Sequence, residues 1–468
     1  MKTKNKPKQL RIVANLIYTG LVLLIICSET TMAGEPWKTL FDGESLQGWV
    51  QRGGKARYTA EDGQIIGTTV FRTPNSFLCT EAAYSDFILE VDFKVAATMN
   101  SGIQIRSNSY PEYRRSVVHG YQIEIDPSER SWTGGIYEES LRGWLYPLDN
   151  NNVEAQKAFK QQQWNRFRIE AIGDTIKTWL NDVPAAHLID DMKREGFIAL
   201  QVHGIGKNKE KQGQTVRWRN IRIITDNPLK YSRPTPIAPR DMFNKLTSKE
   251  KAAGWKLLFD GKTSKGWRGA KLDHFPEFGW EIKDGILTVL ESGGDESKNG
   301  GDIVTIDKYS DFELWVDFKI TAGANSGIKY FVNTSLNKGQ GSAIGLEYQL
   351  LDDQRHPDAK KGSHQGSRTL ASLYDLIKAE NKHPSLIGQW NHARISSKAN
   401  HVEHWLNGRK VLEYERKSDH FRKLVAESKY KIWPGFGEAV QGNILLQDHG
   451  NRVSFRNIKI RLLDKNKK

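Results

Sequence analysis

Short runs in which apolar and polar residues alternate recur along most of the chain. Examples are FILEVDFKV (87–95), YQIEID (121–126) and VRWRNIRI (216–223). A period of two is typical of β-strands with one buried face, and Gly, Asn and Asp residues divide these runs as turns do. Helical periodicity is limited to short segments at 153–161 and 244–254. We therefore predict an all-β fold of two-sheet antiparallel sandwiches with few short helices.

The pattern occurs twice in the same order. LFDGESLQGW (40–49) returns as LFDGKTSKGW (258–267), and YSDFILEVDFKV (84–95) returns as YSDFELWVDFKI (309–320). The motif NSGI starts at Asn100 and Asn325, and Q-x-HG starts at Gln201 and Gln447. Self-similarity of this kind indicates a duplicated domain. We predict two tandem domains, 36–226 and 254–463, joined by a proline-bearing linker at 227–253.

The first 33 residues differ from the rest. Five basic residues precede the apolar run IVANLIYTGLVLLIIC, and the small residues around Ala33 suit a cleavage site. This pattern is typical of a secretory signal peptide and predicts an exported protein, periplasmic or on the cell surface. An uncleaved anchor is the alternative. Lipidation at Cys27 is a lesser alternative, because the bulky Ile26 precedes that cysteine.

Composition indicates an ordinary globular protein of 468 residues, with 38% hydrophobic and 26% charged residues. The net charge of +14 becomes +10 once the five basic residues and Glu29 of the signal are removed. The basic residues form no stripe, aromatic-basic motif or zinc spacing, so nucleic acid is not an expected partner, and the membrane is expected only through the signal. Cys79 would be the one remaining cysteine, which excludes an internal disulfide.

The ordered motifs carry a family resemblance. LFDG…GW, DG-x-I, Y-x-DF…DFK, NSGI, WN…WLN and a closing Q-x-HG…RNI resemble the 3-keto-disaccharide hydrolase family over nearly all of both repeats. The resemblance implies two concanavalin A-like jelly-roll sandwiches. It also implies a carbohydrate substrate and a hydrolase that cleaves glycosides whose glucose carries a ketone at carbon 3.

The chemistry of such a substrate defines the groups to look for. A ketone at carbon 3 acidifies the hydrogen at carbon 2, so the group on carbon 1 can leave by elimination, after which water adds to the enone. This route needs a base beside carbon 2, a donor or cation at the ketone oxygen, and an acid for the leaving oxygen. Polar residues that recur on the strands are the natural candidates.

In the first repeat, period two predicts that Gln104 and Arg106 share one face of their strand, and that Gln122, Glu124 and Asp126 share one face of theirs. If the NSGI spacing is carried forward without a gap, Gln122 matches Glu347 and Glu124 matches Gln349, so acid and amide have exchanged places. Asn100 and Asn325, before Ser-Gly, are expected to shape turns. The first-repeat candidates are Gln104, Arg106, Gln122, Glu124, Asp126 and His203.

The second repeat is the better furnished one. Glu347 or His449 is predicted as base or acid, and Lys329 or Arg368 as the group at the oxyanion. A polar loop, LDDQRHPDAKKGSHQGSRTLASLYD (351–375), adds further candidates. The remaining second-repeat candidates are Tyr374 for catalysis and Gln349, His356 and Gln447 for substrate binding.

A metal ion is the open question in that loop. Asp352, Asp353, His356 and Asp358 are potential ligands, but their spacing fits no established motif. No cofactor is predicted, with a divalent metal as the alternative.

Two tryptophans stand apart from the repeated ones. Trp132 and Trp144 have no partner in the second repeat and lie in a loop-like stretch. Because loops carry much of the binding function of sandwich proteins, we predict that these rings stack on sugar.

Two other functions remain in competition with keto-glycoside cleavage. Concanavalin A-like sandwiches can bind glycans without catalysis. The order Glu124-x-Asp126-x-x-Glu129 is also that of a laminarinase-type glycosidase. Pro127 is expected to end the strand, however, and to turn Glu129 away from the face that Glu124 and Asp126 share.

Overall fold

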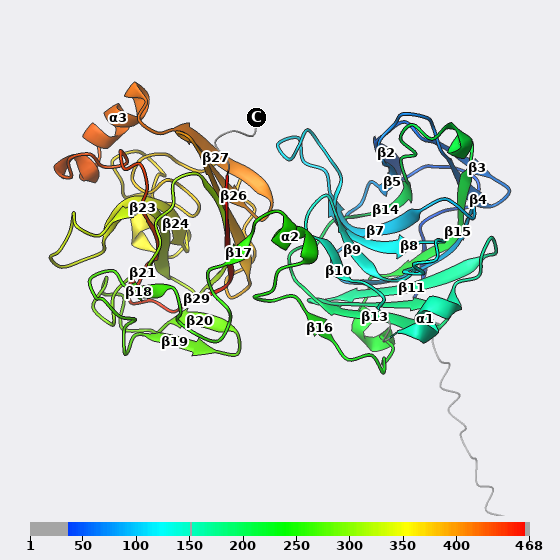
Figure 1. The fold of residues 1–468 in the computed structure, drawn as a ribbon, viewed down its shortest axis with the longest axis horizontal. Helices are drawn as coiled ribbons and strands as arrows, with labels where there is room; N and C mark the ends of the chain where they lie inside the picture. The colour runs from blue at the N-terminus through cyan, green and yellow to red at the C-terminus, as the bar shows by residue number, and fades with distance from the viewer. Residues whose placement is uncertain (1–35, 150–151, 464–468) are drawn as a thin grey trace, which may run out of the picture. The chain divides into compact units, whose positions relative to one another are not determined.

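The computed structural model describes residues 36–149 and 152–463, so the predicted signal peptide and Cys27 lie outside the described residues. The first repeat consists of two antiparallel sheets packed face to face (Figure 1). The nine-stranded sheet runs β16 (Arg240–Asp241), β13 (Val183–Ile189), β12 (Thr175–Leu180), β11 (Asn165–Ile172), β6 (Phe87–Val95), β15 (Thr215–Ile224), β4 (Gln64–Thr68), β3 (Arg57–Glu61), with β1 (Lys38–Thr39) on β15. The seven-stranded sheet runs β10 (Gly143–Tyr146), β9 (Ile136–Glu139), β8 (His119–Ile125), β7 (Ser101–Asn108), β14 (Phe197–Val202), β5 (Ser76–Thr80), β2 (Trp49–Gly53).

The second repeat has the same two-sheet plan. Its eight-stranded sheet runs β19 (Trp280–Lys283), β20 (Ile286–Val289), β29 (Val453–Leu462), β22 (Phe312–Ile320), β25 (Asn391–Lys398), β26 (His401–Leu406), β27 (Arg409–Glu415), with β17 (Lys256–Leu257) on β29. Its five-stranded sheet runs β18 (Trp267–Gly269), β21 (Ile303–Thr305), β28 (Asn443–Leu446), β23 (Asn325–Asn333), β24 (Ile344–Leu351). The predicted all-β tandem sandwich is confirmed.

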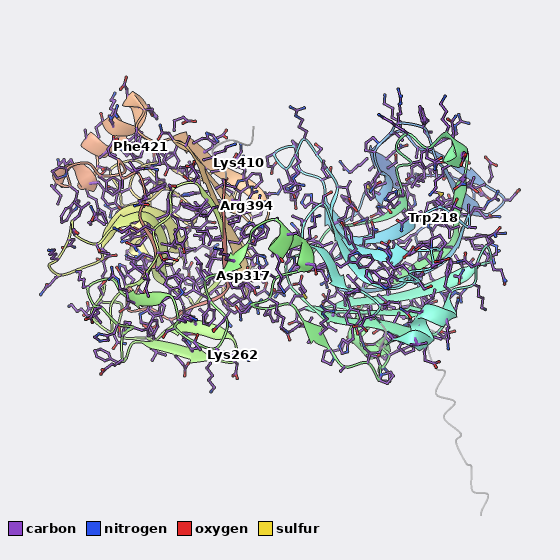
Figure 2. The ribbon with its side chains drawn as sticks, in the orientation of Figure 1. Trp218, Lys262, Asp317, Arg394, Lys410 and Phe421 are labelled. Carbon is purple, nitrogen blue, oxygen red and sulfur yellow. The ribbon has the colours of Figure 1, made fainter. Side chains whose placement is uncertain are left out.

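The alternating pattern explains why the sheets pair. In β6, Phe87, Leu89, Val91 and Phe93 are fully buried in the core of the first repeat. The intervening Glu90 lies on the other face, where it pairs with Arg168 and Arg222. Burial of one apolar face per sheet is what drives two sheets together. Each sandwich therefore has its own core, with Trp218 in the first and Phe421 in the second among the largest buried side chains (Figure 2).

Helices are few and short in the described residues, as predicted. They are α1 (Val153–Ala158), α2 (Ser248–Ala252) and α3 (Asp419–Ala426), with 3-10 turns η1 (Lys209–Lys211), η2 (Pro228–Tyr231), η3 (Pro357–Lys360) and η4 (Lys429–Ile432). Thr247 and Glu250 form a reciprocal capping box at α2, which explains why so short a helix begins there. Among these described helices, none is long and apolar enough to cross a membrane.

The segment predicted as a linker is more ordered than its proline content suggested. Within it, β16 adds to the first repeat as a parallel strand, with Leu188 opposite Arg240 and Ile189 opposite Asp241. The side chain of Lys177 also donates to the carbonyl oxygen of Arg233 at 2.7 Å. Backbone pairing of this kind satisfies the edge of the sheet, so the part of the segment up to β16 belongs to the first sandwich and is not a free tether.

One sequence prediction fails at a bulge in β7. Gln104 and Arg106 were expected to share a face, but Arg106 has a φ of 45° and the register of β7 with β8 shifts after Ile105. A bulge of this kind breaks the period-two alternation. The Arg106 guanidinium consequently binds the carbonyl oxygens of Ser85 and Gly173 at 2.7 and 2.8 Å and is fully buried. Arg106 therefore stabilises the fold and is removed from the predicted substrate-binding set.

Candidate functional site

The five-stranded sheet of the second repeat presents the candidate residues on the face turned away from its core. Ile328 and Tyr330 of β23 pack in the core, as do Leu346 and Tyr348 of β24. The intervening residues therefore point to the opposite face. There the register places Lys329 directly opposite Glu347 and Gly327 opposite Gln349. Lys329, Glu347 and Gln349 therefore share one face of this sheet.

Lys329 and Glu347 form a buried ion pair on this face. Lys329 Nζ lies 3.6 Å from Glu347 Oε2, and the two residues are 5% and 4% exposed. Lys329 also donates to Ser342 Oγ, which in turn donates to Asp302 Oδ2. At Gly327, a Cβ atom would lie 2.2 Å from Glu347 Oε1, so the missing side chain makes the room that the carboxylate occupies.

Burial dominates the electrostatics of Glu347. Loss of water raises the pKa of its carboxyl group above the ordinary glutamate value, Lys329 and Lys429 act against that rise, and Glu296 and Asp302 add to it. A carboxyl group whose pKa is raised toward neutrality is suited to accept and return a proton near neutral pH. The adjacent ammonium group can stabilise negative charge that develops on a bound substrate.

Sequence reasoning missed three charged residues that complete this cluster. Lys429 begins η4, lies over the Tyr374 ring with Nζ 4.3 Å from its centre, and has a pKa lowered by burial. Glu296 accepts from Gln447 Nε2 at 3.0 Å, and Asp302 lies just before β21. These residues come from segments without a motif shared by the two repeats. A search restricted to repeated positions could not find them.

The predicted histidine lies at the start of β23. His449 Nε2 is 3.2 Å from Asn325 Nδ2, whereas its buried Nδ1 atom makes no hydrogen bond within the described chain. Gln349 lies beside it and, with its amide nitrogen toward Glu347, donates to Glu347 Oε1 at 3.2 Å. Asn325, which was expected to shape a turn, is the first residue of β23 after the turn at 322–323, and its side chain contacts the predicted histidine.

The polar loop 351–375 is largely occupied with its own structure. Arg368 donates to Asp358 at 2.8 Å and to Asp375 at 2.7 Å, and Tyr374 donates to Asp358 at 2.7 Å. The two carboxylates raise the pKa of Arg368, although its burial acts against them. Because two carboxylates already balance its charge, Arg368 is less suited than Lys329 to stabilise an oxyanion. Its contacts with Asp358, which also binds Tyr374, indicate that it positions these side chains.

The predicted metal ligands of that loop bind different partners. Asp352 accepts from Gly323 N and Arg355, whereas Asp353 accepts from Leu370 N and Lys382. His356 caps η3, and burial followed by the charge of nearby His449 lowers its pKa. In the described part of the chain the one group whose ligand atoms come within metal-binding range is instead on β26 and β27, formed by His401, Glu403 and Glu413. Lys410 already pairs with that group's glutamates, at 2.6 and 3.6 Å.

In the first repeat, the matching face holds a chain of amides around one carboxyl group. Asn100 and Gln122 donate to Glu124 at 2.7 and 2.8 Å, and Gln104 and Gln201 both donate to Gln122 Oε1. Burial raises the pKa of Glu124 to about 7, although the donors oppose it. Asn100, which was expected to shape a turn, follows the turn at 97–98 and also binds this carboxyl group.

The two predicted stacking tryptophans enclose an arginine. The Arg130 guanidinium lies 4.7 and 4.9 Å from the ring centres of Trp132 and Trp144, which meet edge to face. Arg130 also binds Asp126 at 2.7 Å and Glu124 at 3.3 Å. The ion pairs bring Glu124 and Asp126 to one arginine, in agreement with their predicted common face. The guanidinium, however, occupies ring faces of Trp132 and Trp144 on which a sugar was expected to stack.

Glu129 and His203 lie at the margin of the first-repeat face. Strand β8 ends at Ile125 and Glu129 is exposed in the following turn, so the laminarinase-type order does not return its last carboxylate to the sheet. His203 is exposed, binds the carbonyl oxygen of Gly204 through Nδ1 at 2.9 Å, and lines a cavity of about 170 Å³ with Asn100 and Lys211.

The registers of the two sheets confirm the exchange of acid and amide. In the first repeat Gln104 stands opposite Gln122 and Gly102 opposite Glu124, and in the second Lys329 stands opposite Glu347 and Gly327 opposite Gln349. The first repeat therefore has a neutral pair of amides where the second has a lysine and a glutamate. Only the second repeat combines a cation with a carboxylate at this pair of positions.

Comparison with known proteins then establishes the family. A family model described as a 3-keto-alpha-glucoside-1,2-lyase-like domain matches residues 36–224 and again residues 254–461. The chain belongs to this family. Both copies of the lyase-like domain correspond to the repeats found from the motifs, so the predicted membership and duplication are confirmed.

Relatives of this lyase-like chain match about one repeat. A 3-keto-disaccharide hydrolase of Bacteroides thetaiotaomicron is 39% identical over 233 residues, which are 46% of this chain and 80% of that protein. Two crystal structures from Parabacteroides distasonis, provisionally named glycosyl hydrolases, are 32% and 28% identical, with TM-scores of 0.41 and 0.34. They match 47% and 45% of this chain and 100% and 99% of their own chains.

Proposed function

We propose that the second repeat cleaves 3-keto-glucosides by elimination at carbons 1 and 2, followed by hydration. The observation that carries the proposal is the buried Lys329–Glu347 pair on the face of a lyase-like domain. The name of the Bacteroides relative, 3-keto-disaccharide hydrolase, supports a keto-sugar substrate.

Each step has a group that suits it. Glu347 removes the proton from carbon 2, because its raised pKa makes the carboxylate a competent base. The Lys329 ammonium faces the carbon-3 oxygen, where the enolate charge collects. The enolate then expels the oxygen substituent of carbon 1, and His449 is the proposed donor of the proton to that leaving oxygen. Water adds to the enone and gives the 3-keto-sugar.

The first repeat lacks the groups for this reaction at the equivalent positions. Gln104 replaces the lysine and Gln122 replaces the glutamate, and an amide neither accepts a proton near neutral pH nor carries a positive charge. Glu124 lies one pair further along and is already bound by Asn100, Gln122 and Arg130. We therefore assign turnover to the second repeat.

Steady-state kinetics on a 3-keto-glucoside test the proposal, with and without added divalent metal. Glu347→Gln keeps the volume of the side chain and removes the base, so kcat/KM should fall by roughly 10²-fold or more. Glu403→Gln on β26 makes the same chemical change on the other sheet and serves as the control. Wild-type protein that turns over no 3-keto-substrate refutes the function. If Glu124→Gln lowers kcat/KM and Glu347→Gln does not, the reaction takes place in the first repeat.

The pH profile supplies an independent measurement. The base must be deprotonated, so kcat/KM should rise with pH across a limb that lies above the ordinary titration range of glutamate. The Glu347→Asp variant retains a carboxylate on a shorter side chain. Its kcat/KM should still rise with pH, whereas its kcat should be lower than that of wild type. A flat profile would exclude a carboxylate base.

We also propose that the protein acts after export, on the support of the basic and apolar segment at 1–33. Fractionation of cells and N-terminal sequencing of the recovered protein test this. Full-length protein recovered from the cytoplasm would contradict it.

A further inference from the structure

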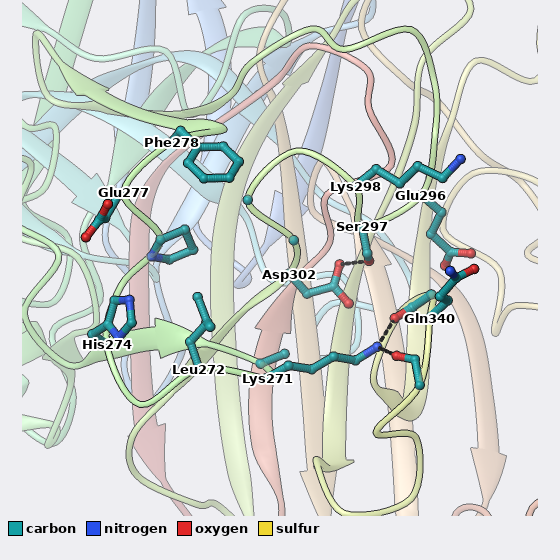
Figure 3. A pocket seen from close by; sticks show the side chains of 17 residues that line it. Lys271, Leu272, His274, Glu277, Phe278, Glu296, Ser297, Lys298, Asp302 and Gln340 are labelled. Carbon is teal, nitrogen blue, oxygen red and sulfur yellow. Dashed lines mark hydrogen bonds between the residues drawn. The ribbon is translucent and has the colours of Figure 1, made fainter.

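A cavity of about 740 Å³ lies beside the Lys329–Glu347 pair and has no role in the reaction so far (Figure 3). It is lined by three segments far apart in sequence, within 269–278, 296–302 and 339–341. The first two adjoin β18 and β21, at the edge of the five-stranded sheet opposite β24, and the third belongs to the connection between β23 and β24. A volume of this size is typical of small-molecule sites.

The cavity is joined to the proposed reaction centre by shared residues. Asp302 lines the cavity and accepts from Ser342 Oγ, which accepts from Lys329 Nζ. Glu296 also lines it and accepts from Gln447, a residue of the same sheet face. A substrate with its keto-glucose over β23 and β24 would therefore direct the substituent on carbon 1 toward this space.

Two charged groups of the cavity are already bound within the protein. Lys271 Nζ donates to the carbonyl oxygens of Gly339 and Gly341. Asp302 accepts from Ser297 Oγ at 3.1 Å and from the backbone nitrogen atoms of Asp448 and Ala343 at 3.0 and 3.2 Å. These two side chains therefore offer few donors or acceptors to the hydroxyl groups of a second sugar.

Two apolar side chains are exposed at the cavity, and the backbone fixes the position of one of them. Phe278 is 64% exposed and Leu272 is 40% exposed, and both line the cavity (Figure 3). Next to Phe278, Gly279 and Gly300 have φ values of 81° and 89°, and a Cβ atom on Gly279 would lie 1.7 Å from the Asn299 oxygen. Only glycine permits this close crossing of the two segments, and the crossing fixes Phe278 at the cavity.

The first repeat has no counterpart of this cavity among its described loops. Its β2 and β3 are joined by residues 54–56, whereas residues 270–279 join β18 to β19. The longer connection supplies Leu272 and Phe278. The cavity is thus confined to the repeat that carries the charged pair.

We infer that this cavity holds the leaving group of the substrate, and that the preferred leaving group is an apolar ring and not a second sugar. The inference rests on the proposed function, since it places the group that departs from carbon 1. The exposed Phe278 and Leu272, beside the bound Lys271 and Asp302, favour an apolar ring, because a sugar placed on these side chains would lose water from its hydroxyl groups without regaining hydrogen bonds there.

The test compares two 3-keto-glucosides whose leaving groups are both alcohols, cyclohexanol and glucose, the second being 3-keto-trehalose. The anomeric hydroxyl of glucose is more acidic than the hydroxyl of cyclohexanol and is the better leaving group, so a preference for the cyclohexyl substrate cannot come from leaving-group acidity. Wild-type kcat/KM should favour the cyclohexyl substrate by roughly tenfold. Phe278→Ala should lower kcat/KM for the cyclohexyl substrate about fivefold more than for 3-keto-trehalose, mainly through KM.

The matched control is Leu386→Ala, which removes an apolar side chain that is 74% exposed and does not line the cavity. It should change neither substrate. Because Phe278 is also exposed, its variant should fold as the wild type does. Turnover of both substrates without the cyclohexyl preference, or an equal loss on both in Phe278→Ala, overturns the cavity assignment and leaves the proposed function standing. Turnover of neither substrate overturns the proposed function itself.

Discussion

Glu124 should make the protein less stable as the pH rises toward neutrality. Burial raises the pKa of this carboxyl group from 4.5 to about 7 in the folded chain. In the unfolded chain the group releases its proton near the ordinary glutamate value. Between these two values the folded state binds more protons, so the free energy of unfolding falls as the pH increases and levels off above the folded pKa. Below the unfolded value, the group has no effect on the slope.

The size of the effect follows from the shift. One pKa unit corresponds to about 1.4 kcal/mol, so the shift at Glu124 corresponds to about 3 kcal/mol. The Glu124→Gln variant has no proton to lose. Relative to wild type, it should therefore gain about 3 kcal/mol of unfolding free energy between about pH 4.5 and pH 8.

Urea unfolding followed by tryptophan fluorescence at several pH values within this window measures the difference. The control is Glu129→Gln, which removes the same charge four positions beyond Ile125, where the side chain is exposed. Its unfolding free energy should run parallel to that of wild type. Parallel curves for Glu124→Gln as well would refute a buried, neutral carboxyl group at this position.

Two substitutions test other features of the sheets. Gly327→Ala should displace the Glu347 carboxylate, which lies 2.2 Å from the added Cβ, and should lower kcat/KM by about 10²-fold. Gly102→Ala creates the equivalent crowding in the first repeat and should leave kcat/KM nearly unchanged, so equal losses would contradict the assignment of turnover. Arg106→Met should cost about 3 kcal/mol in urea unfolding, because the carbonyl oxygens of Ser85 and Gly173 lose a fully buried donor. Arg233→Met, which breaks an exposed ion pair, should cost under about 1 kcal/mol, and similar costs for both would show that burial of Arg106 adds nothing.

Local patterns predicted the strands and the exchange between the two repeats. The alternation in FILEVDFKV predicted one apolar face. The equal spacing after NSGI predicted that Gln122 of the first repeat and Glu347 of the second occupy equivalent positions. Both depend on neighbours along the chain, and period two holds wherever a strand stays regular. The prediction failed at Arg106, where the positive φ of that residue turns its side chain to the other face of the strand.

The chemical candidates were predicted less completely than the strands. Lys329 and Glu347 were found because both lie on repeated strands, whereas Glu296, Asp302 and Lys429 lie outside the repeated motifs. Trp132 and Trp144 were found as a pair, but their sequence did not show that Arg130 lies between their rings. A contact between loops depends on how the whole chain closes, which no local pattern reports.

The sequence by itself determined two sandwiches, their family and the strand positions of the second repeat that carry acid and base. The tertiary structure decided which of these groups are chemically distinct. Desolvation and distant neighbours raise the pKa of Glu347, two carboxylates already bind Arg368, and three separate segments enclose the cavity at Phe278. Strand faces follow from the covalent alternation of the backbone, whereas pKa values and cavities follow from which atoms exclude water around a group.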